Sequence, residues 1–200
     1  MRIAVMRAAP LDAFMRPIPS LLLISLLLNA IGASAVDWPQ LMVACDQQTG
    51  RTVWVCIGVG DKPGYTSPIL INYGGLRQLI TMTSSHAIGV AAGTGKLLWK
   101  YRHPAPYDVN ASQPVYHDGH IALFGTWGRG ATWLRLNVNG DRCTVAEVWR
   151  TAELDNEHGG VVCVGGYLYG QADGNHLHRH WACLDWETGK SMPTTCAGRG

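Results

Sequence analysis

An internal repeat is the feature that most constrains the fold of this chain. The segment ACDQQTGRTVW at residues 44–54 aligns without a gap with GVAAGTGKLLW at residues 89–99, a separation of 45 residues. A third copy, CLDWETGK, begins at Cys183, about two repeat lengths further along the chain. A repeat of this length indicates a supersecondary unit that buries its hydrophobic faces by stacking on its neighbours.

Each repeat contains four short runs of strand-forming residues separated by turn residues. Between residues 67 and 101 these runs are SPILIN, RQLITMT, AIGVAA and LLWKY. The next two repeats follow the same order, although the run after Lys190 is weak, and residues 36–200 show no helical periodicity. A period of about 45 to 50 residues made of four strands is typical of a β-propeller blade. We therefore expect an all-β fold, a partial β-propeller of about three and a half four-stranded antiparallel blades.

The recurring residues suit a tight turn between the third and fourth strands of a blade. An aspartate can accept hydrogen bonds from the turn backbone, a threonine can cap the turn, and a glycine allows positive φ. A tryptophan on the outer strand can pack against the next blade, where its burial contributes at most about 4 to 6 kcal/mol. This structural repeat motif comprises Asp46, Thr49, Gly50, Trp54, Thr94, Gly95, Trp99, Trp149, Asp185, Thr188 and Gly189.

The pattern A-x-D-x-x-T-G-x-x-x-W, with its copies across most of residues 41–190, resembles the blade signature of the PQQ-like repeat family. That family includes quinoprotein dehydrogenases and the propeller lipoprotein of outer-membrane barrel assembly. For a dehydrogenase, the resemblance would imply PQQ held between a tryptophan and two adjacent cysteines, with a calcium ion nearby. No two cysteines are adjacent in this sequence, and a complete ring of blades would be needed to surround the cofactor. We therefore expect no cofactor, and specifically no PQQ.

The N-terminal segment has the pattern of a secretory signal peptide. Arg16 precedes an apolar run from Ile18 to Ile31, and the small-residue site Ala33-Ser34-Ala35 follows. We expect export to the periplasm or the cell surface, with no membrane span after cleavage. The expected division of the chain is a signal peptide at 1–35, a linker at 36–40, PQQ-like blades at 41–195 (a half-blade at 41–56, then 65–101, 112–151 and 159–195) and a tail at 196–200.

Charge and cysteine content exclude several classes of function. Removal of residues 1–35 leaves equal numbers of basic and acidic residues without a Lys/Arg block, so nucleic acid is not an expected partner. The six cysteines show neither a zinc-binding spacing nor a recognisable disulfide framework, and we interpret them as small buried hydrophobic residues whose pairing stays open. Motifs for acyl transfer, nucleotide hydrolysis and zinc proteolysis are absent from the sequence.

Two polar clusters are weak candidates for chemistry. His176, His178 and His180 alternate and would share one face of a strand, where imidazoles could bind Zn²⁺ or Cu²⁺. A polar turn that leads into a strand is the simpler explanation of this tract, a fourth ligand is not evident, and we expect no metal site. The tract DNEHGG at residues 155–160 suits general acid–base work, but ordinary loop polarity explains it too. We expect no catalytic residue.

The expected function is a non-catalytic binding or scaffold role, with an unknown protein partner contacting the propeller loops. Two alternatives remain open: a remnant of a PQQ-dependent dehydrogenase, or a truncated gene product without independent function. Met192-Pro193 stands where the last repeat would carry its docking tryptophan, which favours truncation. Because an open stack leaves sheet faces and strand edges uncovered, we also expect self-association.

Overall fold

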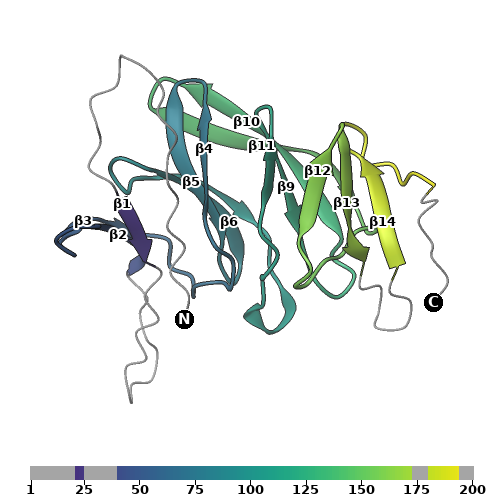
Figure 1. The fold of residues 1–200 in the computed structure, drawn as a ribbon, viewed down its shortest axis with the longest axis horizontal. Helices are drawn as coiled ribbons and strands as arrows, with labels where there is room; N and C mark the ends of the chain where they lie inside the picture. Colours follow the sequence, from purple (N-terminus) through teal and green to yellow (C-terminus); the bar gives the residue numbers. More distant parts are fainter. Residues whose placement is uncertain (1–20, 25–39, 173–179, 194–200) are drawn as a thin grey trace.

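A computed structural model describes residues 21–24, 40–172 and 180–193 of the chain (Figure 1). Four antiparallel sheets follow one another across the molecule in chain order. The only helical segment in the described residues is the short 3-10 turn η1 (Pro106–Asp108). The expected all-β architecture is confirmed.

Each sheet is a meander in which strands adjacent in sequence are adjacent in space, and we call the sheets blades 1 to 4. Blade 1 contains β1 (Leu21–Ile24), β2 (Gln40–Asp46) and β3 (Thr52–Ile57). Blade 2 contains β4 (Ile69–Tyr73), β5 (Leu76–Met82), β6 (His86–Ala91) and β7 (Leu97–Arg102). Blade 3 contains β8 (Val115–His117), β9 (His120–Phe124), β10 (Ala131–Asn139) and β11 (Arg142–Thr151). Blade 4 contains β12 (Val161–Val164), β13 (Tyr167–Ala172) and β14 (His180–Asp185).

The first and last blades differ from the expected units. Blade 1 is not a two-stranded half-blade, because β1 pairs antiparallel with β2 and places Leu21 opposite Asp46. This added strand comes from the apolar run assigned to the signal peptide. In blade 4 the weak fourth run is reduced to a bridge between Leu184 and Ser191. Residues 36–39 of the expected linker and the tail at 196–200 lie outside the described residues.

Hydrophobic side chains lie between successive blades, because alternate residues of each strand point to opposite faces. In β5, Leu79 packs toward blade 1 whereas Ile80 packs toward blade 3. Three clusters of this kind fill the spaces between blades 1 and 2, 2 and 3, and 3 and 4. Face-to-face stacking of antiparallel meanders is the arrangement of propeller blades, so the chain forms a partial β-propeller.

Two of the three joints between blades are closed by the same tryptophan contact. Trp54 of blade 1 donates its ring N–H to the carbonyl of Ala92 in blade 2 at 3.1 Å. Trp149 of blade 3 donates in the same way to the carbonyl of Trp186 in blade 4 at 3.2 Å. Ala92 and Trp186 occupy equivalent positions in the turns that precede Gly95 and Gly189.

Glycine is required at these turns for two reasons. Gly95 and Gly189 have φ values of 74° and 66°, in the left-handed region. In addition, a Cβ at Gly95 would lie 2.6 Å from the ring of Trp54, and one at Gly189 would lie 2.7 Å from the ring of Trp149. The turn glycine therefore provides both the backbone geometry and the flat surface on which the ring of the preceding blade rests.

Hydrogen bonds within the turn hold its shape. Asp46 accepts bonds from the N–H and the hydroxyl of Thr49, both at 2.8 Å, and these bonds hold the pKa of Asp46 below its ordinary value. Asp185 accepts the equivalent bonds from Thr188 at 2.8 and 2.6 Å. The blade 2 turn lacks the carboxylate, but the Thr94 hydroxyl still accepts a bond from the N–H of Lys96 at 3.3 Å.

The joint between blades 2 and 3 is built differently. β10 and β11 are long and continue into a hairpin whose tip reaches blade 2, where Val138 contacts Gly74 and Asp141 pairs with Lys96 at 3.5 Å. Trp99 lies in the cluster between these blades, but its ring N–H donates to the side-chain oxygen of Gln78 in its own blade at 2.9 Å.

The joint between blades 3 and 4 contains an aromatic stack. The rings of His120 and Trp133 lie parallel with centroids 4.2 Å apart, and Trp149 stacks on the same Trp133 at 5.9 Å. Trp186 of blade 4 meets Trp133 edge-on at 5.8 Å. Offset and edge-to-face pairs of this kind each add about 0.5–1.5 kcal/mol to the burial of the rings.

Candidate interaction face

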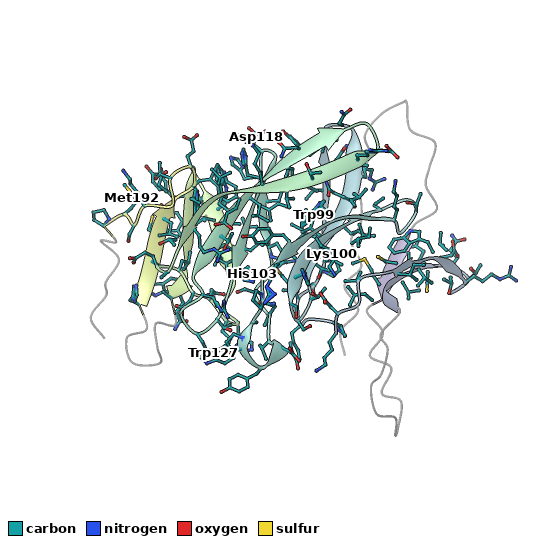
Figure 2. The ribbon with its side chains drawn as sticks, turned by 180° about the vertical axis from the view of Figure 1, so that it is seen from behind. Trp99, Lys100, His103, Asp118, Trp127 and Met192 are labelled. Carbon is teal, nitrogen blue, oxygen red and sulfur yellow. The ribbon has the colours of Figure 1, made fainter. Side chains whose placement is uncertain are left out.

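The connections between blades lie at one end of the stack. In a meander, the turn between the second and third strands and the connection to the next blade lie at the same end. We call this end the loop face, and it comprises residues 58–68, 83–85, 103–114, 125–130 and 152–160. Figure 2 shows His103 and Trp127 toward this end, whereas Asp118, in a turn between first and second strands, lies at the other.

Buried polar residues are concentrated on the loop face. Gln78, Thr81 and Thr132 lie on strands, and the other buried polar residues lie in these loops: Thr83, Ser84, His103, Asn110, Ser112, Thr126, Asp155 and Asn156. Buried polar groups stabilise a structure only when they are hydrogen-bonded, so their bonds define how the loops are held.

Asn110 ties the connections on both sides of blade 2 to the blade itself. Its side-chain amide donates to the carbonyl oxygens of Thr83 at 2.8 Å and His103 at 3.1 Å. Its backbone carbonyl accepts a bond from the N–H of Tyr65, in the connection that leaves blade 1, at 3.0 Å. One buried asparagine therefore fixes three loops relative to one another.

A second set of bonds continues to blade 4. The hydroxyl of Ser112 bonds to the side-chain oxygen of Asn156, whose amide donates to the carbonyl of Gln171 at 2.8 Å. The buried carboxylate of Asp155 accepts a bond from the N–H of Gly128 at 2.8 Å. Together with the bonds of Asn110, these contacts link the described loops of this face into one network and connect it to β13 of blade 4.

Asp61 and His86 form a partly buried contact in the same network, with the geometry of an ion pair. Asp61 Oδ2 lies 2.7 Å from His86 Nδ1 and 2.6 Å from the hydroxyl of Thr83. The Thr83 hydroxyl also accepts a bond from the backbone N–H of His86 at 2.8 Å. An Asp–His pair can orient an imidazole for proton transfer, but here both residues close the turn between β5 and β6.

His103 is buried and neutral. Burial, with smaller contributions from the charges of Arg150 and Arg129, lowers its pKa from 6.5 to about 4. Its ring lies close to Gly125, where a Cβ would approach the imidazole Cε1 to 3.1 Å. His103 therefore fills the space between the blade 2 to blade 3 connection and the β9–β10 turn without carrying a charge at neutral pH.

An aromatic pair lies at the rim of the loop face. Tyr107, in η1, is 86% exposed, and its ring meets that of Trp127 edge-on with centroids 5.5 Å apart. Both residues have positive φ, 56° and 52°, and Asp108, which follows Tyr107 in the chain, has 61°. Such backbone conformations are unfavourable for residues other than glycine and are retained where the surrounding structure enforces them. Exposed Arg129 lies two residues after Trp127.

Of the weak candidates from the sequence, the described residues include His180 and the tract at residues 155–160. His176 and His178 lie outside the described residues, and His180 is exposed at the start of β14. Asp155 is a loop anchor, whereas Glu157 and His158 lie beside each other at 3.8 Å near the surface. Within the described ranges, no group of three His, Cys, Asp or Glu side chains is arranged to hold a metal ion.

The cysteines lie mainly inside the blades. Cys45, Cys56, Cys143 and Cys183 are buried, Cys163 is partly buried, and none of these five described cysteines forms a disulfide. Burial raises the pKa of the Cys56 thiol, which keeps it protonated and unreactive. Cys143 accepts a weak bond from the Gln78 amide at 3.7 Å.

Sequence reasoning missed the loop-face residues. Tyr107, Trp127 and Arg129 lie outside the repeat motif, in tracts that carry only general turn signals. A usable signal was present in TWGRG at residues 126–130, where glycines flank Arg129 on both sides and Trp127 comes just before them. The burial of Asn110 and Asn156 had no local signal, because it depends on how neighbouring connections pack.

No family model matches the sequence, and no curated protein matches it. Among solved structures, the crystal structure of BamB from Moraxella catarrhalis matches with 25% sequence identity and a TM-score of 0.49. That match covers 76% of this chain and 45% of the BamB chain, so this chain spans less than half the length of that protein. Within the described residues, no helix is long and apolar enough to cross a bilayer.

Proposed function

We propose that the chain has a non-catalytic binding or scaffold role, in which the loop face contacts a protein partner. The observation that carries this proposal is the aromatic pair Tyr107–Trp127 at the rim of that face, with exposed Arg129 two residues after Trp127. We call these three residues the rim cluster. Tryptophan, tyrosine and arginine are the residue types that most often dominate the binding energy of protein interfaces.

The support beneath this cluster favours binding over chemistry. The connections are anchored by the buried bonds of Asn110, Asp155 and Asn156, so the exposed side chains are held in place before a partner arrives. A preorganised surface loses less conformational entropy on binding. The polar groups beneath it mainly form hydrogen bonds with backbone atoms of the loops, so their role is structural.

The exposed side chains indicate the chemistry of the partner. The Tyr107–Trp127 pair offers an apolar contact, and exposed Arg129 provides a guanidinium suited to a carboxylate. Lys62 is paired with Asp108 at 2.8 Å on the same face, which reduces the net charge beside the cluster. We infer a partner segment with an apolar or aromatic side chain next to an acidic one.

The proposed location is the periplasm or the cell surface, and the proposed partner resides there. This part of the proposal rests on the apolar run and the small-residue site Ala33-Ser34-Ala35. It does not alter the chemistry of the loop face, which would act in the same way in another compartment.

A photo-cross-linking residue at Tyr107 tests the binding role. We expect it to capture one protein species in the host, and Arg129→Ala to reduce that capture several-fold. The same cross-linker at Asp141, an exposed position in the β10–β11 turn at the other end of the stack, is the matched control. Equal capture from both positions, or none from Tyr107, would contradict a specific loop-face partner.

We also propose that the chain self-associates. The outer faces of blades 1 and 4 carry exposed hydrophobic side chains, including Ile57 and Trp181 at 67% and 63% exposure. Apolar patches of this kind mark association sites. Sedimentation at micromolar concentration should give a mass above that of a single chain.

A further inference from the structure

The two ends of the stack are complementary surfaces. On blade 4, Val162, Tyr169 and Trp181 point away from blade 3 and are 59%, 41% and 63% exposed. On blade 1, Val53 and Ile57 point away from blade 2 and are 48% and 67% exposed. In Figure 1 these blades form opposite ends of the row of sheets.

The outer face of blade 4 corresponds to a face that packs under a blade elsewhere in the chain. The β12–β13 turn of blade 4 matches the β8–β9 turn of blade 3, so Val162 and Tyr169 take the positions of Val115 and Ala122. Val115 and Ala122 belong to the cluster between blades 3 and 4. The outer face of blade 4 is therefore the side on which a propeller adds its next blade.

The outer face of blade 1 corresponds to the opposite side of that joint. The repeat aligns Val43 and Cys45 of β2 with Ile88 and Val90 of β6. Ile88 and Val90 are fully buried where blade 2 receives blade 1. The outer face of blade 1 is therefore a receiving face.

The turn of blade 1 also keeps the features of a receiving turn. Asp46 and Thr49 make the same hydrogen bonds as Asp185 and Thr188 in blade 4. A Cβ at Gly50 would meet no atom within 4 Å, whereas one at Gly189 would meet the ring of Trp149. Among the described residues, nothing rests on the Gly50 turn.

We propose that a second copy of this chain closes the propeller, with blade 4 of each copy packed on blade 1 of the other. This arrangement rests on the proposed self-association and specifies its geometry. A two-fold axis then produces two identical joints and a closed ring of eight blades, within the range of about four to eight that propellers use. Pairing of blade 4 with blade 4 would join two adding faces. Because Met192-Pro193 stands in place of a docking tryptophan, blade 4 would pack on blade 1 through Val162, Tyr169 and Trp181.

Charge substitutions at the two faces test the arrangement. Val162→Lys and Ile57→Glu change exposed residues, so each monomer should fold with an unchanged far-ultraviolet spectrum. Alone, each variant damages both joints of the ring and should sediment as a monomer. Mixed in equal amounts, the two variants form one joint without substitutions and one joint that carries both, so a dimer should reappear through the native joint. Val148→Lys, on an exposed valine of β11 away from both ends, is the matched control and should remain dimeric.

The outcomes separate the arrangement from self-association itself. A wild-type mass of twice that of the single chain under study, loss in both variants and recovery on mixing would support the ring. A wild-type monomer would contradict self-association as well as the ring. A dimer lost in only one variant, a mixture that stays monomeric, or masses that grow with concentration would overturn the ring while leaving self-association in place.

Discussion

At the scale of single residues, the docking of tryptophan on a turn glycine can be isolated by a matched pair of substitutions. Gly95 and Gly50 have similar φ values of 74° and 69°, but only a Cβ at Gly95 would meet a ring, that of Trp54. Gly50→Ala should lower the free energy of unfolding by about 1–2 kcal/mol through left-handed strain alone. Gly95→Ala adds a clash with the ring and should lower it by about 1–3 kcal/mol more.

Urea denaturation of both variants measures this difference directly. The two substitutions share the same change of side chain and nearly the same backbone conformation, so the strain contribution cancels. Equal midpoints for Gly95→Ala and Gly50→Ala would show that Trp54 moves away freely and does not fasten blade 1 to blade 2.

His103 makes a prediction about pH. Its pKa is about 4 in the folded chain and 6.5 when unfolded, so the unfolded state binds more protons between these values. Neutral His103 makes its full contribution to stability above pH 6.5. As the pH drops toward 4, the free energy of unfolding should fall by up to about 3 kcal/mol. His103→Phe should flatten this part of the stability profile, whereas His158→Gln, at an exposed imidazole, should leave it unchanged. A wild-type profile that is flat between pH 6.5 and 4 would show that His103 is hydrated on folding.

The sequence predicted the residues of the repeated turn well, because their hydrogen bonds are local. The positions of Asp46, Thr49 and Gly50 follow from turn chemistry within six residues of chain. The environment of Trp99 did not follow from the motif. Its joint depends on the length of the β10–β11 hairpin and on buried Gln78, and both are properties of packing between blades.

At the scale of elements, the sequence predicted which runs form strands better than it predicted which strands join to form each sheet. The runs LLWKY and WACLD lie within β7 and β14, because short alternating runs bounded by turn residues have few other solutions. β1 was not predicted as a strand, because an apolar run before a small-residue site reads as a leader whatever its partner in space. The loop-face network was also beyond prediction, since it joins connections that are distant in sequence.

Cleavage after Ala35 would remove β1, which gives an element-scale prediction. We expect the exported protein to begin at Val36, and N-terminal sequencing checks this. In the processed chain, the β2 amides that face β1 should exchange with solvent faster than in the full chain, because their ladder partner is gone. The β2 amides that face β3 provide the internal control and should not change. Secreted material beginning at Met1 or Met15 would contradict the signal peptide.

At the scale of the whole molecule, the number of blades and the cysteine spacing bear on the same question. The four blades of the described residues form an open row and not a closed ring (Figure 1), and no two of the six cysteines are adjacent. The features that the PQQ-like resemblance links to the cofactor are therefore missing from the chain in two independent respects. Closure of a ring by a second copy would supply walls, but it would not supply the adjacent cysteines.

We therefore expect no binding of PQQ, with or without Ca²⁺. The eight tryptophans provide the readout, because a quinone stacked near any of them would quench its fluorescence. Titration to micromolar quinone should reduce the emission only as much as it does for free N-acetyltryptophanamide, which controls for light absorbed by the quinone itself. Repeating the titration on the Val162→Lys variant tests whether any binding requires the proposed ring of two copies. Saturable one-to-one quenching in the wild type would contradict the prediction and favour a dehydrogenase remnant. If that quenching were lost in Val162→Lys, the cofactor would lie within a ring of two copies.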